Sequence, residues 1–116
     1  MAWGDGGTLG SGQSKTAATT IALTTSAVAE AGSVVMVVVA IDNTATADAE
    51  TSEVSSISDS AGGNTWVKVK EWCNAQGGAN AGDTASLWYS KLTNQIASGG
   101  TITANLANSI TAKAIT

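Results

Sequence analysis

The sequence of 116 residues contains no histidine, no proline and no phenylalanine, and it has a single cysteine. The absence of histidine excludes catalytic triads of the Ser-His-Asp and Cys-His types. One cysteine cannot form an intrachain disulfide, and zinc or iron–sulfur sites need several ligands, so Cys73 is expected to be a small, half-buried residue. No glycine-rich stretch has the Gly-Lys-Ser/Thr ending of a phosphate-binding loop. We therefore expect no catalytic residues and no cofactor, and we predict that the protein is not an enzyme.

Charged residues are also scarce. They make up 12% of the chain, with five Lys/Arg against nine Asp/Glu and a formal net charge of -4. Nucleic acids and anionic membranes are both bound through cationic patches, so we expect neither as a partner. The polar surface must be carried by uncharged side chains, which suits a protein packed among neighbours or one facing an extracellular medium.

β-Forming patterns dominate what is present. Residues 33–41 form an unbroken, mostly β-branched apolar run, which predicts a strand buried on both faces. Residues 84–91 alternate, with Ala85, Leu87 and Tyr89 on one face and Ser86, Trp88 and Ser90 on the other. In residues 65–72, the two tryptophans and two lysines share one face and the valines the other.

We expect about seven short strands separated by turn signals, which is typical of an all-β antiparallel sandwich or jelly roll. Two long polar loops, residues 42–52 and 74–83, are expected between them. The length suits one domain with a modest core. The expected strands are residues 16–23, 33–41, 54–58, 65–72, 84–91, 101–106 and 110–115.

The two ends of the chain suggest contacts with neighbours. Residues 1–14 are glycine-rich and are predicted to form a flexible arm ahead of a β-sandwich domain at residues 15–116. Trp3 and Leu9 are apolar anchors that such an arm could place on another subunit. The sequence stops at Thr116 inside an expected strand, so we predict an open strand edge, which a partner chain could complete.

Acidic side chains near strand ends are the candidates for an ion site. Asp42, Asp48 and Asp59 supply the oxygen ligands that calcium prefers, although none has EF-hand spacing. The alternative for Asp59 is that it binds the backbone of its own turn. A hydrolase would need two carboxylates on opposite walls of a cleft, whereas Asp48 and Glu50 lie on one loop.

Large aromatic side chains are few, and they are the candidates for binding. With no phenylalanine available, we expect Trp66, Trp72, Trp88 and Tyr89 to pack in the core or at a subunit interface. The alternative is that one of the tryptophans lies exposed in a groove and stacks on the sugar rings of a host glycan.

Five segments together carry a resemblance to a known family. They are residues 58–69 (SDSAGGNTWVKV) with Glu71 and Trp72, residues 85–91 (ASLWYSK), residues 99–104 (GGTITA), and the opening residues 7–14 (GTLGSGQS) with residues 37–43 (VVVAIDN). This set resembles a family of β-sandwich virion structural proteins, jelly-roll or Ig-like, that are encoded by tailed bacteriophages. The resemblance implies a fold and a setting, and it transfers no catalytic residues.

From the residues and the resemblance we predict a structural subunit of a phage particle. A capsid decoration or cement protein, or a tail or fibre subunit, would act as a homo-oligomer packed against other virion proteins. The opening residues lack the basic start and apolar core of an export signal, so we expect assembly into the virion in the host cytoplasm. A glycan-binding module remains the alternative.

Overall fold

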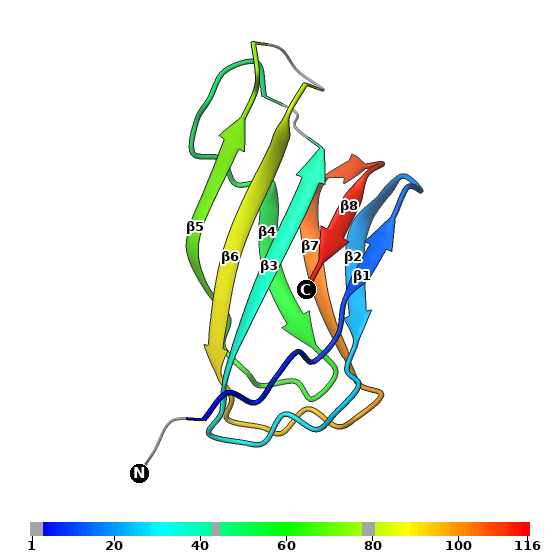
Figure 1. The fold of residues 1–116 in the computed structure, drawn as a ribbon, viewed down its shortest axis with the longest axis vertical. Helices are drawn as coiled ribbons and strands as arrows, with labels where there is room; N and C mark the ends of the chain where they lie inside the picture. The colour runs from blue at the N-terminus through cyan, green and yellow to red at the C-terminus, as the bar shows by residue number, and fades with distance from the viewer. Residues whose placement is uncertain (1–3, 43–44, 78–80) are drawn as a thin grey trace.

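The structure is a computed structural model that describes residues 4–42, 45–77 and 81–116. The described residues form eight strands and no helix, and so they include no helix long and apolar enough to cross a membrane. The strands make two antiparallel sheets that pack against each other, and the predicted all-β sandwich is confirmed (Figure 1). The strands are β1 (Gly12–Ser14), β2 (Ala18–Thr24), β3 (Val34–Asp42), β4 (Val54–Asp59), β5 (Val67–Asn74), β6 (Asp83–Lys91), β7 (Thr101–Ile110) and β8 (Lys113–Ile115).

The two sheets differ in size. One has five strands in the order β1-β8-β3-β6-β5, and the other has three in the order β2-β7-β4. The shortest dimension of the molecule is 22 Å. Two sheets about 10 Å apart, with side chains on their outer surfaces, account for that depth. No third layer therefore covers the far side of the five-stranded sheet in the described part of the chain.

The core lies between the sheets and is made by alternate residues of each strand. From β3 it takes Val35, Val37 and Val39, all between 0 and 7% exposed. The three-stranded sheet contributes Ile21, Leu23, Val54, Ile57, Ile102, Ala104, Leu106 and Ile110.

The prediction that residues 33–41 are buried on both faces is wrong. Val34, Met36 and Val38 are 42, 61 and 43% exposed, because only one face of β3 has a sheet packed on it. An unbroken apolar run is typical of a strand covered on both sides. Here the outer side of the run is apolar and uncovered.

Strand β6 turns its hydroxyl side chains toward the core and other, apolar side chains toward solvent. Thr84, Ser86 and Ser90 face the core with Trp88, whereas Ala85, Leu87 and Tyr89 face outward. The indole nitrogen of Trp88 donates to Ser86 Oγ at 2.5 Å. Two of the buried hydroxyls, Thr84 Oγ1 and Ser90 Oγ, have no hydrogen-bond partner among the described residues. The strand therefore buries hydroxyls, at a cost, while its apolar side faces out.

A β-bulge corrects the predicted faces of β5. Lys68 pairs with Trp88 and Lys70 with Leu87, so Val69 is the extra residue between them. This extra residue turns Lys68 toward the core side, where its ammonium lies 5.1 Å from the Trp88 ring, and leaves Lys70 on the outside with Trp72. The predicted face shared by both lysines and both tryptophans does not exist.

Both ends of the described chain are tied to the sandwich. Gly12–Ser14 form β1, so the predicted arm is shorter than residues 1–14. Leu9 packs against the domain's own core, and its carbonyl accepts a hydrogen bond from the backbone of Ser26 at 2.7 Å. β8 lies between β1 and β3, so the predicted open C-terminal edge is wrong. A short strand from the start of the chain covers it. Trp3 lies outside the described residues.

Candidate functional site: an exposed apolar sheet face

Most of the large exposed apolar side chains in the described part of the chain gather on one surface. We call it the outer face: the outward side of β3, β6 and β5. Eight large hydrophobic residues are exposed, and six of them belong to this face. Val28 lies in the loop before β3, and Val69 is the bulge residue of β5. The six are Val34, Met36, Val38, Val67, Trp72 and Tyr89, each between 40 and 61% exposed.

Strand register arranges the outer face in rows across the sheet. One row contains Met36, Tyr89 and Val67, and we call it the bulky row. The next row contains Val38, Leu87 and Lys70, and the one after it Ala40, Ala85 and Trp72. Side chains in such rows are cross-strand neighbours within contact distance. The apolar residues therefore form one continuous patch.

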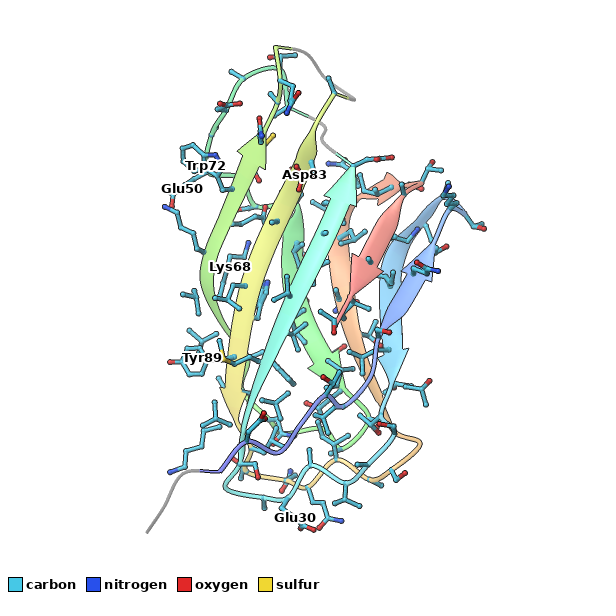
Figure 2. The ribbon with its side chains drawn as sticks, in the orientation of Figure 1. Glu30, Glu50, Lys68, Trp72, Asp83 and Tyr89 are labelled. Carbon is cyan, nitrogen blue, oxygen red and sulfur yellow. The ribbon has the colours of Figure 1, made fainter. Side chains whose placement is uncertain are left out.

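The size of this patch matches that of the largest apolar patch on a typical soluble monomer, about 300–600 Å². The six large side chains together expose about 500 Å², given the 150–250 Å² of a fully exposed large side chain. Patches of this size are often functional on soluble proteins. Figure 2 labels two of its members, Trp72 and Tyr89, which project to the same side of the molecule.

The outer face is hollow where its side chains are small. A shallow depression of about 650 Å³ lies over Ala40 and Ala114 and reaches Asp42 and Asp83. A second, of about 500 Å³, adjoins it and is lined by Val38, Ala40 and Ala114. No aromatic residue lines either depression. Ala85, the neighbour of Ala40 on β6, is also small but lines neither depression, and Trp72 stands beside it on β5; we call the Ala40–Ala85 pair the hollow row.

Charges stand at opposite ends of the outer face. Asp42 and Asp83 are cross-strand partners at one end, and Lys91 lies beside Val34 at the other. Lys70, on the β5 side, forms an ion pair with Glu50, and its ammonium lies 5.6 Å from the Trp72 ring. The face is thus an apolar strip with an acidic end and a basic end.

The predicted aromatic site residues separate into two groups. Trp88 is 5% exposed and belongs to the core. Trp66 is half-buried against the core, and its indole nitrogen donates to Asp59 Oδ2 at 2.8 Å. Trp72 and Tyr89 lie on the outer face. The valines and methionine of β3 were missed, because nothing in the sequence distinguishes an uncovered apolar face from a covered one.

Glu71 is the one strongly buried carboxylate in the described residues, at 2% exposed. It accepts hydrogen bonds from Thr51 Oγ1 at 2.7 Å, from the backbone of Glu53 and Val54 at 2.5 and 3.1 Å, and from Lys68 Nζ at 3.1 Å. Burial raises the pKa of Glu71, but these four donors outweigh it and hold the pKa below the ordinary 4.5. Its role is structural: it ties the segment before β4 to β5.

The three calcium candidates are separated in the structure. Asp59 accepts bonds from its own turn, at the backbone of Ala61 and Gly62. Asp42 accepts from the backbone of Ala112 at 3.2 Å, and Asp48 from that of Ala75 at 2.8 Å. Within residues 4–42, 45–77 and 81–116, no three acidic, histidine or cysteine side chains form a group suited to a metal ion.

Comparison with known proteins adds no relative: no family model matches this chain, and no curated protein or solved structure matches it either.

Proposed function

We propose that this chain is a structural subunit of a phage particle and that it attaches to a neighbouring protein through the outer face. The observation that carries the proposal is the apolar outward side of β3, β6 and β5, combined with the buried hydroxyls of β6. A strand usually keeps its hydroxyls toward water, whereas β6 buries Ser86 and Ser90 beside Trp88 and leaves Tyr89 40% exposed on the other side. This arrangement favours an outer surface that is covered in the working protein.

The outer face offers apolar surface whose burial would favour attachment. Removing about 500 Å² of apolar surface from water is worth about 12 kcal/mol before the costs of association are subtracted. The scarcity of charge on the apolar strip means that few ions need be desolvated. Sheet edges and loops remain outside this contact. The setting in a phage particle rests on the sequence resemblance, and the attachment surface rests on the geometry.

Binding of a host glycan is a second candidate, favoured by the exposure of Trp72 and Tyr89. Their placement argues against a shared sugar site. They lie two rows apart, about 13 Å along the strands, with the Leu87 row between them. Neither ring lines a depression, and the Lys70 ammonium lies over Trp72.

Location in the particle is the direct test of the proposed function. Particles purified from cells that make this protein are analysed by quantitative mass spectrometry and by cryo-electron microscopy. We expect the chain in many copies at symmetry-related positions. Its absence from the particles, with the protein free in the lysate, would contradict the proposal.

A matched pair of variants tests the surface. Val38→Asp places a charge at the centre of the outer face, whereas Val28→Asp changes an equally exposed valine in a loop away from it, 43 against 42%. We expect Val38→Asp to be lost from the particles and Val28→Asp to be retained. Circular dichroism and thermal unfolding of both purified variants establish that each is folded. Equal incorporation of the two would rule out this surface.

A further inference from the structure

The geometry points to a second copy of this chain as the occupant of the outer face, in a two-fold dimer. This inference deepens the proposed function and rests on the outer face being an interface. In a face-to-face pair the two-fold axis lies between the sheets, and here it would run across the strands, above the Val38–Leu87 row. Each strand then lies over its own copy in the reverse direction.

Shape is the first argument for this arrangement. The Val38–Leu87 row lies midway between the bulky row and the hollow row, two residues from each along both strands. Reversal about that row places Met36 and Tyr89 of one copy over Ala40 and Ala85 of the other. Large side chains therefore meet small ones on β3 and β6 at both ends of the contact, as in interdigitated sheet packing, whereas on β5 Val67 of one copy meets Trp72 of the other. Val38 and Leu87 meet their own copies on the axis.

Charge is the second and independent argument. Lys91 and Asp83 are each four residues from Leu87 on β6, in opposite directions. The same reversal therefore brings Lys91 of one copy to the acidic end of the other, where Asp83 and Asp42 are neighbours. The contact occurs twice by symmetry. A surface complementary to itself in both relief and charge is what an isologous interface requires.

The extent of the outer face suits such a dimer. β3 and β6 have nine residues each, so the face is about 30 Å long. Its apolar strip, hollow row and charged ends together approach the roughly 800 Å² per partner of a standard stable interface. Lys70 would face its own copy near the margin, but each Lys70 is already neutralised by Glu50.

Charge reversal gives a test specific for a second copy. Lys91→Glu sets a negative charge against the acidic end of the partner, and we expect at least about 10-fold weaker dimerisation. Asp83→Lys should weaken it by only about 3-fold, because Asp42 remains beside the new lysine. Glu30→Lys makes the same change in the loop before β3, outside the paired strands and at the bottom of Figure 2, and should leave the dissociation constant within about 2-fold.

Mixing the variants provides the decisive measurement. In a mixed dimer of the Lys91→Glu and Asp83→Lys proteins, the new glutamate meets the new lysine, and the other contact is native. Sedimentation velocity at several concentrations should therefore show recovery to within about 3-fold of the wild-type dissociation constant. Only contact between two copies in this arrangement gives that recovery. Circular dichroism establishes that each variant is folded.

The outcomes separate this inference from the proposed function. A wild-type protein that stays monomeric at about 100 μM, or mixed variants that do not recover, overturns the second copy as occupant. If the chain is nevertheless present in particles and needs Val38, another virion protein covers the outer face. A dimer in solution combined with absence from particles would leave the dimer standing and overturn the proposed function.

Discussion

Replacing Glu71 should destabilise the fold far more than replacing any exposed carboxylate. Its side chain is 2% exposed and receives two backbone N–H donors, one hydroxyl and the Lys68 ammonium. Glu71→Ala leaves the donors of Glu53 and Val54 without an acceptor. Glu71→Gln keeps the shape but presents an amide N–H₂ where two donors now meet an oxygen. Glu50→Gln is the matched control, because Glu50 is exposed and forms an ion pair with Lys70.

The expected magnitude follows from these contacts. Each buried donor left unpaired costs about 1–3 kcal/mol, and the loss of a buried ion-pair partner costs about 3–5 kcal/mol. Lys68 is 25% exposed and can turn to water, so we count the two unpaired backbone donors alone, at about 2 kcal/mol each: about 4 kcal/mol for Glu71→Ala and about 2 kcal/mol for Glu71→Gln. For a chain of this length 1 kcal/mol corresponds to about 4 °C, so the two melting temperatures should fall by about 15 and 8 °C. Glu50→Gln should stay within about 0.5 kcal/mol.

The pH dependence adds a second, independent measurement. The pKa of Glu71 in the folded protein is below 4.5, so the unfolded state takes up its proton first on acidification. Its contribution to stability is therefore complete above about pH 4.5 and is lost as pH falls through the lower folded pKa. Urea unfolding of wild type and Glu71→Gln between pH 7 and pH 3 should show a gap in free energy that narrows below about pH 4.5. Equal stability of Glu71→Gln and Glu50→Gln at pH 7, or a gap that is constant with pH, would refute this reasoning.

Two further changes test the described packing. A Cβ at Gly12 would lie 2.2 Å from the carbonyl oxygen of Ala22, so Gly12→Ala should cost about 1–3 kcal/mol of stability and speed hydrogen exchange in β1 and β8. Gly6→Ala is the control, because a Cβ there would have nothing within 4 Å, and it should change neither quantity. Equal exchange rates in the two variants would contradict the close packing of β1 on β2. Trp72 is 47% exposed and Trp88 5%, so Trp72→Phe should remove more of the acrylamide-quenchable fluorescence than Trp88→Phe, and the reverse order would show that the faces of β5 and β6 are assigned wrongly.

The sequence predicted the strands well because strand formation depends on local pattern. β-Branched runs and alternation placed β3 and β6 to within a residue or two, and turn residues such as those around Gly62 and Gly63 marked the ends. Both of these glycines have positive φ, at 69 and 72°, as a turn requires. The all-β class followed from this pattern.

Which side of a strand faces the core could not be predicted. Alternation in β6 separates Leu87 from Ser86 but does not say which one is buried, and the usual assumption that hydroxyls face water gives the wrong answer here. The bulge at Val69 reverses the faces of β5 without any sequence signal. β1 was missed because its pairing with β8 joins residues about 100 positions apart and depends on Gly12 having no side chain.

The reversed polarity of β6 has a consequence for the life of the protein in the cell. Most domains become less prone to aggregate as they fold, because folding buries their apolar surface. In this chain the folded domain keeps Leu87 and Tyr89 on the surface beside the valines of β3, so the native monomer itself presents an apolar surface on which other molecules can associate. Its solubility should then depend on how completely a partner, a second copy included, covers the outer face.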